Sequence, residues 1–185
     1  MKCTHWVVGL AFVLFGSSAS ASPILVDGTW HEFSFNLAVS PAGGCAGCTV
    51  TTNPLAEQGT VPPWTFSGAA TLTIVDVFTP GDRFEAFDFG VSLGTTSVVP
   101  NVGFSACGGD IGCALADPAF SQLVVNIGPG AHSLTLNVIQ NAGVSNGGAA
   151  VFQVSPLAVP EPGMLLLLGA GLAAARLRGW RRAQS

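Results

Sequence analysis

Two glycine-rich segments of the 185-residue sequence each carry a pair of cysteines. Cys45 and Cys48 are separated by two residues, and Cys107 and Cys113 by five. Disulfides form and persist in exported proteins, and four cysteines allow three pairings, of which we expect the two local ones. A thioredoxin-like site at Cys45 and Cys48 would need a helix that starts after a strand, and zinc would need tighter spacing between the pairs. Both remain alternatives.

Three aspartates recur at a spacing of six residues. Asp76, Asp82 and Asp88 surround a turn predicted at residues 80–82, where Pro-Gly-Asp follows a β-branched run. Carboxylate oxygens are ligands that Ca²⁺ prefers, so the three side chains form a candidate calcium site, although the spacing is not that of an EF-hand. The interpretation that we favour is simpler: Asp76 and Asp82 flank a surface turn, with Arg83 as their partner. We expect no other cofactor.

Residues for catalysis are few once the first 21 residues are set aside. The histidines are His31 and His132, each in a strand-like run, where a lone histidine is usually an ordinary surface or core residue. Glu32, Glu85 and Asp88 leave a pair of carboxylates for glycoside hydrolysis open, because sequence gives no distances between them. We therefore expect a protein that is not an enzyme.

Two tryptophans remain in the central part of the chain. Trp30 and Trp64 could stack on sugar rings, but large aromatic side chains in a domain with few charges usually belong to the core. A carbohydrate-binding surface is thus an alternative to a purely structural role.

The central part of the chain is acidic. The whole sequence has a formal net charge of −4, yet between residues 22 and 159 Arg83 is the one basic residue beside nine acidic ones, a balance of 1 − 9 = −8. One arginine cannot neutralise a run of phosphates, so we expect no nucleic-acid partner.

Short alternating or β-branched runs separated by Gly, Pro, Asn and Asp dominate this central part. Such runs predict strands, and seven or eight of them without long helical patterns predict an all-β fold, an antiparallel β-sandwich or jelly-roll-like domain, over residues 22–158. The runs lie at residues 31–39, 65–78, 83–89, 91–99, 122–127, 133–139 and 149–154.

The N-terminal residues have the pattern of a secretion signal. Lys2 precedes an apolar run at residues 6–15, and Ala19, Ser20 and Ala21 give the small-x-small pattern that signal peptidase accepts. The run is too short to span a bilayer comfortably. We expect residues 1–21 to be a signal peptide that signal peptidase removes.

The C-terminus combines three features in a fixed order. Pro160, Glu161 and Pro162 precede an apolar run at residues 164–175, and four arginines follow between residues 176 and 182. Arginines beside an apolar helix favour the cytoplasmic side of a membrane. The run predicts a short transmembrane helix, although its length alone would also fit a buried helix.

This order at residues 159–185 resembles the PEP-CTERM sorting signal. The resemblance implies an exported protein of a Gram-negative bacterium that makes extracellular polysaccharide. This polysaccharide is a candidate partner of the protein. It also implies that an exosortase-type enzyme recognises Pro160, Glu161 and Pro162 and removes the helix and tail. The chain would be held transiently in the inner membrane and then reach the cell surface or extracellular matrix.

Together these patterns predict an exported surface or matrix protein with a non-enzymatic, structural or interaction β-domain. A carbohydrate- or Ca²⁺-dependent binding module is the alternative, and an extracellular hydrolase is the least favoured of the three.

Overall fold

The computed structural model describes residues 20–101, 107–143 and 147–157. Eleven strands and one short helix lie in this part of the chain. In chain order they are β1 (Ser22–Pro23), β2 (Trp30–Phe35), β3 (Ser40–Pro41), β4 (Gly43–Gly44), β5 (Trp64–Ser67), β6 (Ala70–Asp76), β7 (Arg83–Asp88), β8 (Val91–Thr95), α1 (Ile111–Ala116), β9 (Gln122–Ile127), β10 (Ala131–Gln140) and β11 (Gly148–Pro156).

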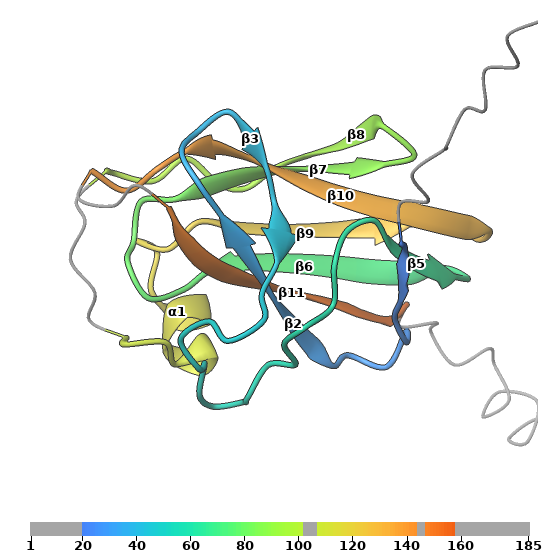
Figure 1. The fold of residues 1–185 in the computed structure, drawn as a ribbon, viewed down its shortest axis with the longest axis horizontal. Coiled ribbons are helices and arrows are strands. Elements are labelled where there is room, and N and C mark those ends of the chain that lie inside the picture. The colour runs from blue at the N-terminus through green and yellow to red at the C-terminus, as the bar shows by residue number, and fades with distance from the viewer. Residues whose placement is uncertain (1–19, 102–106, 144–146, 158–185) are drawn as a thin grey trace, which may run out of the picture.

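The strands form two sheets, which Figure 1 shows as two layers. One sheet has the order β1-β5-β10-β7-β8, with β3 also paired to β10, and the other has the order β4-β2-β11-β6-β9. Pairing is antiparallel apart from β1 with β5. The all-β prediction is therefore confirmed.

The main core lies between the two sheets, because one face of every long strand is apolar. β6 turns Ala70, Leu72 and Ile74 inward, and each is completely buried. Phe33 of β2 meets Phe84 of β7 edge to face across the interface, with ring centroids 5.1 Å apart. These contacts join the sheets into a sandwich-like body.

A second, smaller core covers the outer face of the sheet that contains β2 and β11. Helix α1 and the loop around Ala56 lie over this face and bury Trp30, Val75 and Val151. Because both faces of this sheet are covered, β2 is buried along almost its whole length. This explains why polar residues of β2 end up inside the protein.

The predicted runs match the longer strands in position. Residues 122–127 form β9 as predicted, whereas residues 65–78 are divided by a turn at Gly68 into β5 and β6. Helix α1 and the two-residue strands β1, β3 and β4 were not predicted. Residues 1–19 of the predicted signal peptide and the C-terminal segment from residue 158 lie outside the described residues.

The first paired residue of the described chain is the one that follows the predicted signal-peptidase site. Ser22 donates its backbone N–H to the Pro63 carbonyl at 3.0 Å, and its hydroxyl accepts a bond from the Val61 N–H. The first strand among the described residues therefore begins directly after the predicted cleavage site.

Candidate functional sites

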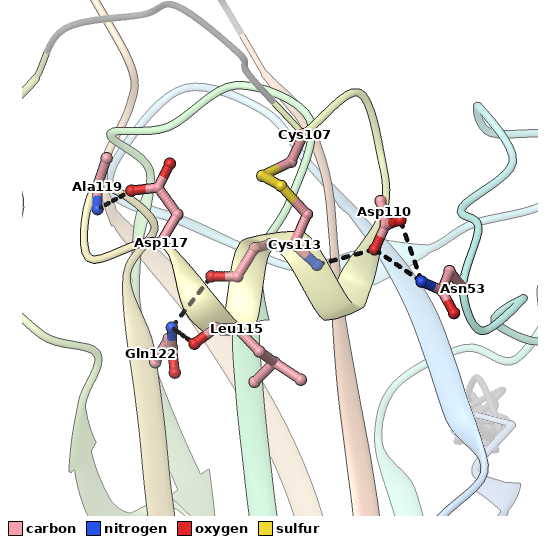
Figure 2. The surroundings of a disulfide bond; sticks show 9 residues. Asn53, Cys107, Asp110, Cys113, Leu115, Asp117, Ala119 and Gln122 are labelled. Atoms are coloured by element: carbon pink, nitrogen blue, oxygen red, sulfur yellow. Dashed lines mark hydrogen bonds between the residues drawn. A yellow bond between two sulfur atoms is a disulfide. The ribbon is translucent and has the colours of Figure 1, made fainter.

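The cysteines pair locally, as the sequence analysis expected: Cys45 with Cys48 and Cys107 with Cys113, each with 5.5 Å between the Cα atoms. Figure 2 shows how the second disulfide closes the loop that enters α1. Asp110 caps the helix, because its Oδ1 accepts the Cys113 N–H at 2.8 Å. This bond lowers the pKa of Asp110. The cap and the disulfide thus act on the same turn.

Helix α1 is also fastened at its other end. The side-chain amide of Gln122, at the start of β9, donates to the carbonyls of Ala114 and Leu115 at 3.1 and 3.0 Å (Figure 2). These carbonyls would otherwise lack partners at the helix terminus. The helix is therefore held over the second core by side chains and a disulfide, and we assign it a structural role.

The Cys45–Cys48 disulfide lies beside a buried carboxyl group. Glu32 is completely buried, and one of its carboxylate oxygens lies within 4.8 Å of both sulfur atoms. Its Oε2 accepts a bond from the Gln58 amide at 2.9 Å, whereas its Oε1 has no partner among the described residues. Burial raises the pKa of Glu32, opposed by the Gln58 hydrogen bond. From the sequence, Glu32 is a candidate only for a hydrolytic carboxylate, and its position beside the disulfide is not predicted.

His31 is buried on the opposite face of β2. Its ring packs against Phe152 with 5.4 Å between centroids, and neither ring nitrogen has a hydrogen-bond partner among the described residues. Glu57 lies 3.6 Å from Nδ1. Burial lowers the pKa of His31, against the raising effect of Glu57, so the ring behaves as a neutral core side chain.

His132 is held from both sides on β10. Its Nδ1 lies 2.8 Å from Asp88 Oδ2, and its Nε2 lies 3.0 Å from the Gly128 carbonyl oxygen. Asp88 Oδ1 accepts the backbone N–H of Ser133 at 2.9 Å. Both partners of the ring are acceptor oxygens, one on β7 and one in the turn before β10. This arrangement fixes the turn between β9 and β10.

Asp76 and Asp82 meet between the two sheets. Both are buried, and Asp76 Oδ2 accepts the backbone N–H groups of Gly81 and Asp82 at 3.1 and 3.2 Å. Asp76 Oδ1 has no partner among the described residues. Burial, reinforced by the charge of Asp82, raises the pKa of Asp76 to about 9, and burial raises that of Asp82 to about 6.

This geometry corrects two sequence-based interpretations. The three aspartates do not surround one hairpin together, because Asp88 lies at the far end of β7 and holds His132 instead. Asp76 and Asp82 are also not surface partners of Arg83, whose side chain donates to the carbonyls of Ser97 and Thr96.

The remaining candidate residues have structural surroundings. Trp30 and Trp64 are buried in the two cores, and Trp64 Nε1 donates to Thr60 Oγ1 at 3.1 Å, so neither offers an open ring face for a sugar. Glu85 accepts a bond from Ser92 Oγ at 2.6 Å. The structure gathers none of Glu32, Glu85 and Asp88 into a pair, since Glu32 lies on β2, and Glu85 and Asp88 lie three residues apart on β7, on opposite faces of the strand.

Comparison with known proteins bears on the tail. Residues 158–183 carry the PEP-CTERM protein-sorting motif. The suspected resemblance is thereby confirmed, and the PEP-CTERM motif supports export and sorting by an exosortase. The match covers the tail and not the central domain. No curated protein and no solved structure matches the chain. No helix among the described residues has the length and apolar character needed to cross a membrane.

Proposed function

We propose that this is an exported surface or extracellular-matrix protein whose two-sheet domain has a structural or interaction role and no catalytic one. The observation that carries the proposal is the PEP-CTERM motif at residues 158–183. β11, which pairs with both β2 and β6, ends at Pro156, just before this motif. Cleavage at Pro160, Glu161 and Pro162 would therefore cut none of the strands that the structure describes between residues 20 and 157.

The two disulfides support an extracytoplasmic destination. Each closes a short loop, and such bonds persist where the surroundings are oxidising. The positions of the two described histidines support the non-enzymatic role. His31, beside Glu57, lies in one sheet, and His132, beside Asp88, lies in the other, so the two histidines do not share a site. Signal peptidase and an exosortase are the partners that this proposal requires, with the inner membrane as a transient anchor.

Replacing Pro160 and Pro162 by alanine tests the sorting step. We expect the variant to remain in the inner membrane, whereas the unchanged protein reaches the cell surface or medium. The matched control replaces Pro54 and Pro118, which lie in loops of the central domain, and should leave sorting unchanged. Normal release of the Pro160/Pro162 variant would refute processing at this segment.

One observation favours a second candidate function, a Ca²⁺-dependent interaction module. Asp76 Oδ1 is buried without a partner among the described residues, and Asp82 lies beside it. We propose that these carboxylate oxygens would bind Ca²⁺. Ca²⁺ must displace the proton from Asp76, so millimolar Ca²⁺ should raise Tm more at pH 8 than at pH 5. Asp76→Asn should abolish the increase. An unchanged Tm at both pH values would exclude this function.

A further inference from the structure

The backbone of β2 and β4 brings a carboxyl group to a disulfide. β4 pairs antiparallel with β2, with Gly44 opposite Phe33. Continuing this register by one residue places Cys45 opposite Glu32. A Cβ atom on Gly44 would lie 2.3 Å from a methyl carbon of Val61, so only glycine allows the chain to pass here. The close contact between Glu32 and the sulfur atoms is therefore built into the strand pairing.

The surroundings of Glu32 bind one of its two carboxylate oxygens and leave the other without a hydrogen-bond partner among the described residues. The Gln58 amide donates to Glu32 Oε2 at 2.9 Å and to the Cys48 carbonyl at 3.2 Å, and so ties the carboxyl group to the cysteine loop. The Gly59 N–H donates to the Cys45 carbonyl at 3.0 Å. Glu32 Oε1 is buried and has no partner among the described residues. A buried polar atom without a partner is costly and needs an explanation.

The two cysteines differ in their exposure to solvent. Cys45 is completely buried, whereas Cys48 is partly exposed, next to the exposed residues Ala46 and Gly47. A thiol from solution would therefore approach Cys48, and the Cys45 sulfur would be the one that leaves. A leaving thiolate in a buried place needs a proton, because its charge is poorly solvated there.

We propose that the Cys45–Cys48 disulfide is a thiol–disulfide exchange site for external dithiols, with Glu32 as the proton donor and acceptor for Cys45. The thiolate of a dithiol attacks Cys48 Sγ and forms a mixed disulfide while the bond between the two cysteines breaks. Cys45 Sγ leaves with the electron pair and takes the proton of the Glu32 carboxyl group. The second thiol of the reagent then resolves the mixed disulfide and releases Cys48 as a thiol. The protein disulfide gains two electrons and two protons, and the dithiol becomes a disulfide.

The ionisation of Glu32 suits this role. Its raised pKa keeps the carboxyl group protonated further toward neutral pH than an exposed glutamate, and one water or a small side-chain rotation spans the distance to sulfur. His31, which precedes Glu32, and Glu57, whose backbone carbonyl accepts the Glu32 N–H at 2.8 Å, interact with each other at 3.6 Å. The Cys107–Cys113 disulfide offers a contrast, because its neighbour Asp110 has a lowered pKa and is ionised.

The test measures reduction by dithiothreitol for each disulfide separately, in protein recovered from the envelope of its host. Samples are quenched with acid, alkylated and analysed by peptide mass. We expect Glu32→Gln to slow reduction of Cys45–Cys48 about a hundredfold or more, since general acid catalysis typically contributes about 10²- to 10⁴-fold. Cys107–Cys113 serves as the internal reference. Glu57→Gln, a change of an exposed neighbour, should alter neither rate.

A second measurement needs no variant. In the unchanged protein, the Cys45–Cys48 rate divided by the dithiothreitol thiolate concentration should fall as pH rises and Glu32 loses its proton, while the same ratio for Cys107–Cys113 stays flat. Equal rates in the Glu32→Gln and unchanged proteins, equal slowing of both disulfides, or parallel pH profiles would each overturn the proposal. These outcomes are independent of the sorting step, which does not involve this disulfide.

Discussion

Replacing Asp76 by asparagine tests how the carboxyl group between the two sheets is ionised. In the folded protein the pKa of Asp76 is raised to about 9, chiefly by burial and then by the charge of Asp82. Asparagine has the same shape, carries no proton equilibrium, and can accept the same bonds from the N–H groups of Gly81 and Asp82. The substitution therefore removes the titration while leaving these contacts available.

The sign and the magnitude follow from linkage. An aspartate in the unfolded chain loses its proton near its ordinary pKa of 3.8, whereas folded Asp76, with a pKa of about 9, keeps its proton up to about pH 9. The unfolded state thus binds fewer protons throughout this interval, so the free energy of unfolding falls as pH rises. Each pH unit is worth about 1.4 kcal/mol, so from pH 4 to pH 7 Asp76 alone removes about 4 kcal/mol.

The assay is urea unfolding of both proteins at pH 4.5 and about pH 7.5 with the disulfides intact. Between these pH values, the free energy of unfolding of the unchanged protein should fall by several kcal/mol more than that of Asp76→Asn. All other titrating groups are present in both proteins, so the difference belongs to Asp76. Asp27→Asn is the control: the pKa of Asp27 is lowered, through the Thr29 N–H, so its small effect has the opposite sign. Equal pH dependence of the Asp76→Asn and unchanged proteins would refute the buried, protonated state.

Two further predictions concern what holds the fold together. Replacing Cys107 and Cys113 by serine should lower the free energy of unfolding by about 2 kcal/mol, the loop-closure value for so short a ring. The same change should speed amide hydrogen exchange in α1. Unchanged exchange there would contradict the role of this disulfide in holding the helix. Phe33→Ala should cost about 3–5 kcal/mol in chemical unfolding, because the ring is completely buried between the sheets, whereas Phe89→Ala, at a ring that is 67% exposed, should cost little; similar losses would contradict the assigned core.

The sequence predicted the long strands because their side chains alternate over one buried face. β9 and β10 illustrate this: both have repeating apolar positions, and the glycine-rich turn at residues 128–130 separates them. Helix α1 was not predicted, because six residues are too few to show a helical period, and the helix depends on the Asp110 cap and a disulfide. Such tertiary causes leave little trace in local sequence.

The candidate sites were predicted less well than the strands, and the aspartates show why. Asp82 and Asp88 are separated by the length of β7, about 20 Å at the rise of an extended strand, so equal spacing in sequence did not mean proximity. A usable signal did exist for Asp76, which continues the inward series Ala70, Leu72 and Ile74. The contact of Glu32 with the disulfide depends on the pairing of β2 with β4, which sequence alone did not reveal.

The most direct test of the account is the intact mass of the protein recovered from the envelope and culture medium of its own host. We predict a chain that begins at Ser22 and ends close to Pro160, Glu161 and Pro162, lighter by two hydrogens for each of its two disulfides. Such a mass would establish export, sorting cleavage and disulfide formation together. A mass that still includes residues 164–185 in every fraction would contradict exosortase processing and reduce the tail to a membrane anchor.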